Sequence, residues 1–203
     1  MKARELLLVG VACAAVSATC IAPALADVAG YREEGPAWTH TASACAVDPQ
    51  QLGKAFENGA DFSFLPTAFS DTPPRLRGIY LPLVARCNVV NSLDADPASQ
   101  NPAWNALIVG YSDPDGAGPS TSVGATLFQV SRDTGNTSTV VTFDSNDHDV
   151  TARTEELVQF NQPIDFRHNE YYVELDLIRT PAATRQSPVI YSVRLVWVEE
   201  YLF

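Results

Sequence analysis

The strongest constraint on the fold is a strict alternation of apolar and polar residues in two segments. In residues 171–177, tyrosine, valine and leucine alternate with Tyr172, Glu174 and Asp176, and residues 191–197 repeat the pattern with Arg194 in the polar row. A period of two places one row on a core and the other in water, as in a half-buried β-strand. We expect Arg194 to lie opposite Glu174 or Asp176 as a cross-strand ion pair.

The rest of the chain from residue 41 onward shows the same strand-like composition. Turn-forming Pro, Gly, Asp and Asn residues separate further expected strands at 41–47, 61–64, 79–90, 105–111, 123–130, 139–143 and 156–160. Strands at this spacing predict an all-β fold, an antiparallel β-sandwich or jelly-roll-like domain of about eight strands. Residues 48–58 differ, because Asp48, Pro49 and Gly59 are typical of the ends of a short helix or helical turn.

The N-terminus has the layout of a cleavable signal peptide. Lys2 and Arg4 precede an apolar run over residues 6–22, and the small-residue pattern Ala24-Leu25-Ala26 follows. We therefore expect a signal peptide at 1–26, a flexible lead-in at 27–40 and a single domain at 41–203, with no transmembrane segment after cleavage. The protein is expected to be exported, to the periplasm or the extracellular space. A membrane anchor and a lipoprotein modified at Cys20 are the alternatives.

Charge and cysteine content restrict the partners and the compartment. A formal net charge of −11 argues against nucleic acid and against anionic membranes, because both require a concentrated positive field. Two of the four cysteines lie in the expected signal peptide, which leaves Cys45 and Cys87. An even pair in an oxidising compartment predicts a disulfide, worth roughly 4 kcal/mol in the chain-entropy model. No Cys-x-x-Cys is present, so a static disulfide is favoured over redox or metal chemistry.

Acidic turns are the most distinctive local feature. Strands 105–111 and 139–143 point the same way if the middle strands form an antiparallel meander, so the turns that follow them emerge at one end. That end would gather five carboxylates, those of Asp113, Asp115, Asp144, Asp147 and Asp149. Ca²⁺ binds several such oxygens from flexible loops, so calcium is the one cofactor considered. The alternative is that these residues are turn formers bonded to their own backbone.

Side chains that could bind a ligand are mainly aromatic. Four rings are candidates for partial exposure, those of Trp38, Trp104, Tyr111 and Tyr172, and such rings stack on sugars or fill a partner's pocket. Catalytic signatures are absent from the sequence: it has no Gly-x-Ser-x-Gly, and its three histidines lack the close spacing of zinc ligands. A hydrolase with a dispersed site stays open, because a triad or carboxylate pair has no fixed order in sequence.

Three short motifs carry a resemblance. Arg86-Cys87-Asn88-Val89, Tyr171-Tyr172-Val173 and Ser192-Val193-Arg194-Leu195 resemble exported bacterial β-sandwich proteins with no assigned activity. The resemblance implies the fold and carries no functional residue over. The favoured hypothesis is a non-enzymatic extracytoplasmic binding or assembly module that contacts an envelope protein or a cell-surface glycan. A Ca²⁺-dependent carbohydrate-binding domain and a hydrolase are the alternatives, and exposed edge strands leave pairing into a homo-oligomer open.

Overall fold

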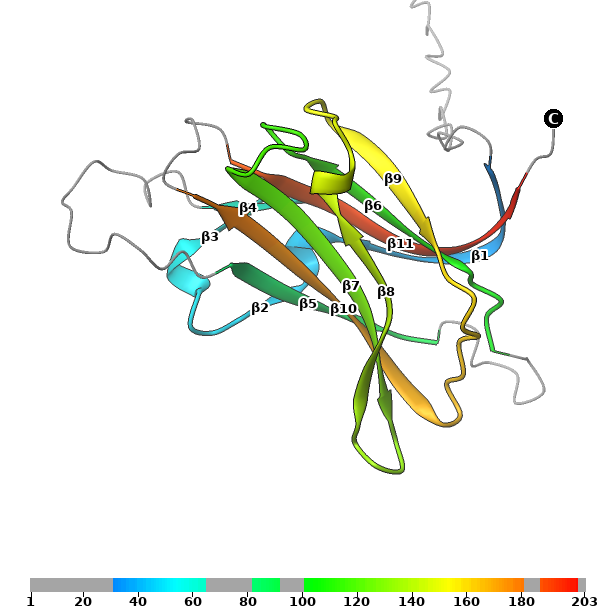
Figure 1. Cartoon of the computed structure of the whole chain (residues 1–203). Helices are drawn as coiled ribbons and strands as arrows, with labels where there is room; N and C mark the ends of the chain where they lie inside the picture. Colours follow the sequence, from blue (N-terminus) through cyan, green and yellow to red (C-terminus); the bar gives the residue numbers. More distant parts are fainter. Residues whose placement is uncertain (1–30, 65–81, 92–100, 181–186, 201–203) are drawn as a thin grey trace, which may run out of the picture.

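A computed structural model describes residues 31–64, 82–91, 101–180 and 187–200, without the side chains of Glu34 and Glu200. The expected signal peptide at 1–26 and residues 79–81 of one expected strand lie outside this part. Within it, eleven strands form two antiparallel sheets packed face to face (Figure 1), so the predicted all-β sandwich is confirmed. None of the helices in these ranges is long and apolar enough to cross a membrane.

The first sheet collects strands from both ends of the described chain. Its strands are β1 (Tyr31–Thr41), β3 (Ala55–Asn58), β4 (Asp61–Phe64), β6 (Ala106–Ser112), β9 (Thr154–Gln159) and β11 (Val189–Glu200). They follow the order β3-β4-β11-β6-β9, and β1 pairs with the remaining length of β11. Strands distant in sequence are therefore neighbours here.

The second sheet contains the hairpin at the centre of the sequence. Its strands are β2 (Ala46–Val47), β5 (Leu83–Val89), β7 (Thr121–Ser131), β8 (Thr137–Asp144) and β10 (Asn169–Arg179), in the order β2-β5-β10-β7-β8. The chain crosses from the first sheet to the second after β6 and returns after β8 (Figure 1). The ends of β6 and β8 accordingly lie at one end of the sandwich, although by a route between sheets and not by a simple meander.

The core lies between the two sheets and follows the predicted alternation along β10. Tyr171, Val173, Leu175 and Leu177 point inward and are almost fully buried, whereas Tyr172, Glu174 and Asp176 are only partly exposed on the outer face. Each buried aliphatic side chain stabilises the fold by about 1.5–3 kcal/mol relative to an exposed one. Alternation is thus the sequence signal that specifies both the strand and its inner face.

The alternation fails at the start of β11, where the register shifts between Ile190 and Ser192. Ile190 and Val193 enter the core, so Tyr191, predicted in the inward row, lies on the outer face. There its ring packs over Gly110, where an added Cβ would be 2.4 Å from the Tyr191 ring. The predicted pairing of Arg194 with Glu174 or Asp176 is also wrong, because β11 and β10 belong to different sheets.

Three segments differ from the sequence-based expectation. Residues 41–47, expected as one strand, contain the 3-10 turn Ala42–Ala44 between the end of β1 and the two-residue strand β2. Residues 31–40, expected as a flexible lead-in, belong to β1, which is paired along β11 and anchored by the buried ring of Trp38. Residues 48–58, expected as a short helix or helical turn, contain one 3-10 turn at Leu52–Lys54, but their last four residues form strand β3. Pairing with β4 stabilises an extended backbone over Ala55–Asn58, and this long-range contact outweighs the local helix signals.

The predicted disulfide is confirmed and lies at the edge of the second sheet. Cys45 and Cys87 are bonded, with their Cα atoms 4.5 Å apart, one position beyond the Ala46–Arg86 pair of β2 and β5. This separation is typical of directly opposed residues in an antiparallel ladder. Since β2 has only two residues, the disulfide is the main covalent support of its pairing with β5.

Candidate functional site

A groove opens at the end of the sandwich where β6 begins and β9 ends. Residues 101–105, which lead into β6, and residues 160–164, which follow β9, line a volume of about 460 Å³. The two segments are tied together, because the Phe160 amide donates to the Asn105 carbonyl over 2.8 Å. The Asn105 side chain in turn clamps β11 through the backbone of Val198. The acidic turns lie at the opposite ends of β6 and β9.

The lining of the groove combines amides with apolar groups and contains no charged side chain. Trp104, Phe160 and Ile164 are almost fully buried and form its apolar base. Asn161 and Gln162 are exposed at its rim. An amide side chain offers both donors and acceptors, so this rim can match hydroxyl and carbonyl groups without requiring charge.

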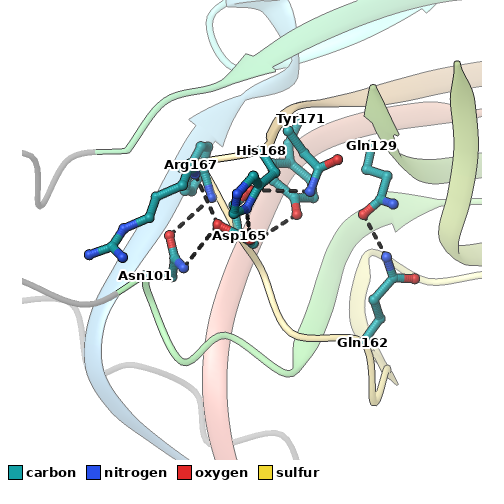
Figure 2. Close-up of polar contacts among 9 residues, drawn as sticks. Asn101, Gln129, Gln162, Asp165, Arg167, His168 and Tyr171 are labelled. Carbon is teal, nitrogen blue, oxygen red and sulfur yellow. Dashed lines mark hydrogen bonds and ion pairs between the residues drawn. The ribbon is translucent and has the colours of Figure 1, made fainter. Parts of the chain in front are cut away.

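One wall of the groove is fixed by a network around Asp165 (Figure 2). The Asn101 amide donates to Asp165 Oδ1 over 3.2 Å, and its oxygen accepts from the Phe166 backbone amide over 3.0 Å. The Arg167 amide also donates to Asp165 Oδ1, and the amide of Asp165 donates to the Tyr171 hydroxyl. Two of these four hydrogen bonds join the 165–168 turn to Asn101, and the other two hold the turn itself in place, so this wall of the groove is fixed.

His168 completes the network at the surface. Its Nδ1 lies 2.6 Å from Asp165 Oδ2, and hydrogen bonding from His168, followed by the Arg167 amide, lowers the pKa of Asp165 below its ordinary value of 3.8. A depressed pKa in the folded state stabilises the fold above the unfolded-state pKa, and this stabilisation is lost as the pH falls.

The opposite rim is linked to the second sheet by a pair of amides. Gln162 Nε2 donates to Gln129 Oε1 of β7 over 2.5 Å, as Figure 2 shows. This contact orients Gln162 at the groove rim. Asn101, Gln162 and Asp165 were not predicted as site residues from the sequence. The sequence feature that could have identified them is the group of amide and proline residues beside Trp104 and Phe160. These residues lie at the ends of two strands, β6 and β9, that are neighbours in the first sheet.

At the other end, the structure brings together only part of the predicted calcium set. Asp113 and Asp115 both contact the hydroxyl of Thr121, and the Ser145 hydroxyl donates to Asp113 Oδ2 over 2.5 Å. Asp149 lies against Gly116 across the two turns. Asp144 instead accepts from the Asn146 amide as an N-cap, and Asp147 is exposed.

Asp113 and Asp115 compete for the same hydroxyl group, that of Thr121. The Thr121 hydroxyl has one proton, so it can donate to only one of the two carboxyls and must accept from the other. Asp115 also accepts from the amides of Ser120 and Thr121, which lower its pKa against the opposing effect of burial. Burial raises the pKa of Asp113, which is fully inaccessible. Folding therefore disfavours ionisation of Asp113 more than that of Asp115, and calcium binding by this set stays a prediction.

The four candidate aromatic rings occupy different environments. Trp38 and Trp104 are buried, and Trp104 Nε1 donates to the Pro36 carbonyl over 2.8 Å. Tyr111 is fully buried against Phe143, and burial, aided by Glu156 and Asp113, raises the pKa of Tyr111 to about 12. Only Tyr172 is partly exposed, stacked on Phe128 on the outer face of the second sheet. The expected exposure of the other three rings is wrong, because Trp38 and Tyr111 occupy inward strand positions and Trp104 packs edge-on against Phe166 just before β6.

Comparison with known proteins gives little similarity. No family model matches the chain, and no curated protein matches its sequence. A structure of infectious bursal disease virus, Gx strain, aligns with 81% of this chain and 32% of its own chain, at 17% identity and a TM-score of 0.29. The chain thus spans about a third of that protein, and a similarity of this size defines no family.

Proposed function

We propose that this protein is an exported binding module whose groove at 101–105 and 160–164 binds a neutral, hydroxyl-rich ligand of the glycan class. The observation that carries the proposal is the chemistry of the groove: amides at the rim, apolar rings at the base and no charged lining residue. Sugar hydroxyls pair with amide donors and acceptors, and the apolar faces of sugar rings pack on aromatic groups. The net charge of −11 disfavours anionic ligands, and a groove without charged side chains offers no ion-pair partner to a cationic one.

The size and rigidity of the groove support the same conclusion. Its volume of about 460 Å³ lies within the range of small-ligand sites, roughly 300–1,000 Å³. The Asp165 network and the Gln129–Gln162 contact hold its walls before any ligand arrives. A preorganised site loses less conformational entropy on binding, so modest contacts are sufficient for specific recognition.

The test uses protein purified after export and titrated with neutral hexose and N-acetylhexosamine oligosaccharides, followed by calorimetry and amide NMR shifts. We expect binding that shifts residues 101–105 and 160–164 and that weakens roughly 10-fold in Asn161→Ala or Gln162→Ala, as for a lost hydrogen bond or two. Asn136→Ala is the matched control, because Asn136 is exposed beside the β7–β8 turn and does not line the groove.

Two results would contradict the glycan proposal. One is the absence of binding to every oligosaccharide in the panel. The other is binding that Asn136→Ala weakens as much as the two groove variants do. If an envelope protein binds instead, and the groove variants release it, the site is retained and the partner becomes a protein. Export itself is checked by N-terminal sequencing, which should begin at Asp27.

A further inference from the structure

His40 lies beside the disulfide, on a different strand from either cysteine. Its Nδ1 is 3.7 Å from the Sγ atom of Cys45, and one ligand atom each from His40, Cys45 and Cys87 lie within 4.8 Å of one another. The histidine comes from β1, Cys45 follows the 3-10 turn Ala42–Ala44, and Cys87 belongs to β5. The pairing of β1 with β11 and of β2 with β5 thus brings two sulfurs and an imidazole nitrogen to one point.

We propose that reduction of the Cys45–Cys87 disulfide creates a Zn²⁺ site formed by the two thiolates and the imidazole of His40. Zinc binds thiolate sulfur at about 2.3 Å and imidazole nitrogen at about 2.0–2.1 Å in tetrahedral geometry. These lengths place a ligating nitrogen and sulfur about 3.6 Å apart, close to the observed 3.7 Å between His40 Nδ1 and Cys45 Sγ. Only the two sulfurs have to separate, and cleavage of their bond permits this.

A dithiol reductant supplies the electrons and protons that open the Cys45–Cys87 disulfide. The disulfide takes two electrons and two protons from the reductant, which becomes a disulfide itself. The two cysteine thiols then release their protons to solvent as the sulfurs bind the ion. His40 binds the ion through Nδ1, which lies 3.1 Å from the Thr41 carbonyl oxygen, so the neutral imidazole carries its single proton on Nε2 in the metal complex. Water fills the fourth position.

Access to this site is set by burial. Cys45 and Cys87 are 6% and 1% exposed, whereas His40 is partly exposed and stacked on the ring of Trp38 at a centroid distance of 5.5 Å. An ion reaches the sulfurs past the imidazole, which is the outermost of the three ligands. The stacked tryptophan gives a direct optical signal, because a metal bound to His40 changes the surroundings of the Trp38 ring.

The experiment compares oxidised and reduced protein, with Co²⁺ as the spectroscopic probe and Zn²⁺ as the competitor. Reduced protein should develop thiolate-to-cobalt absorption, with a change in tryptophan fluorescence, and Zn²⁺ should abolish the absorption. Oxidised protein should do neither. Loss of a residue that only hydrogen-bonds a metal ligand weakens metal binding roughly 10- to 100-fold. His40→Ala removes a ligand itself and should weaken Zn²⁺ binding by at least this factor. His148→Ala, which changes a histidine in the turn between β8 and β9, should bind like the wild type.

Circular dichroism keeps the proposal falsifiable if reduction unfolds the protein. In that case Zn²⁺ should restore the β spectrum of the wild type and fail to restore that of His40→Ala, because binding then supplies folding free energy. Two results overturn the proposal: reduced protein that takes up Co²⁺ no more tightly than oxidised protein, or a cobalt spectrum and Zn²⁺ affinity that His40→Ala leaves unchanged.

Discussion

Asp113 is a carboxylic acid enclosed by hydroxyl groups at the end of the sandwich. Burial raises its pKa, while its hydrogen bonds with Ser145 and Thr121 oppose that rise. A group whose pKa is raised by folding stabilises the native state below its unfolded pKa. That stabilisation is lost as the pH increases through the folded pKa. Because the Thr121 hydroxyl contacts both Asp113 and Asp115, their titrations interact, and the loss belongs to the pair and not to one residue.

The variant Asp113→Asn tests this assignment. An amide keeps a donor for the Thr121 hydroxyl and an acceptor for Ser145, and it cannot ionise. We expect the unfolding free energy of the variant minus that of the wild type to increase from acidic to alkaline pH, measured by urea unfolding across that range. Asp113→Ala, which leaves both hydroxyls without this partner, should cost about 1–3 kcal/mol. A difference for Asp113→Asn that falls with increasing pH would mean that Asp113 is ionised when folded.

Individual site residues could be predicted from the sequence only where the residue type and its position after a strand indicate a role. Asp113 and Asp115 were selected because acidic residues follow a strand, and their convergence at one end was predicted. Their common partner Thr121 was not, because it begins the next strand in the other sheet. Asn101 and Asp165 were missed for the same reason: 64 residues separate them, and the contact depends on how β6 and β10 are arranged in space.

At the scale of elements, Arg194 joins three strands of the first sheet. From β11, its guanidinium donates to Glu33 of β1 over 2.9 Å and to Glu155 of β9 over 2.8 Å. The Arg194 side chain is 10% exposed, and its Nε atom has no hydrogen-bond partner in the described part of the chain. The second sheet has a matched pair at its surface, Arg86 with Glu174, in which the arginine side chain is 52% exposed.

Replacing arginine by methionine is expected to lower the free energy of unfolding more at Arg194 than at Arg86. Arg194→Met leaves two carboxylates without their cation in a nearly buried site and should destabilise the protein by about 3–5 kcal/mol. Arg86→Met removes an exposed pair and should cost at most about 1 kcal/mol. Urea midpoints at constant slope measure both. Equal costs for the two variants would show that solvent reaches the Glu33–Arg194–Glu155 cluster as freely as it reaches Arg86.

Elements with strict alternation were predicted well, except at the start of β11, and elements that depend on long-range pairing were predicted poorly. Residues 61–64 and 171–177 are strands as predicted, and the inward row of residues 171–177 follows from the sequence. Residues 31–40 were not predicted as a strand, because Gly35 and Pro36 interrupt any local pattern. The register of β1 shifts at that point, between Glu34 and Trp38, yet pairing continues along β11. A strand of this kind is stabilised by its partner, which local composition does not reveal.

At the scale of the whole molecule, the two sheets share the main core of the described residues, and a smaller buried cluster of Ala106, Ile108, Val196 and Val198 lies apart from it. Phe62 and Ile190 of the first sheet and Phe143 and Leu127 of the second belong to the same buried cluster. Removing one sheet would expose the inner face of the other, so neither is expected to be stable alone. The pairing of β1 with β11 joins the two ends of the described chain, and such non-local contacts are typical of domains that fold in milliseconds to seconds.

This arrangement predicts one cooperative unfolding transition for the oxidised protein, with equal calorimetric and van't Hoff enthalpies. The double variant Cys45→Ala with Cys87→Ala should unfold in the same single transition. Its free energy of unfolding should be lower by about 4 kcal/mol, because the bond closes a loop over a sequence separation of 42 residues in the unfolded chain. Two resolved transitions in the oxidised protein would instead mean that the sheets unfold separately. The shared core would then be too weak to couple the groove at one end of the sandwich to the acidic turns at the other.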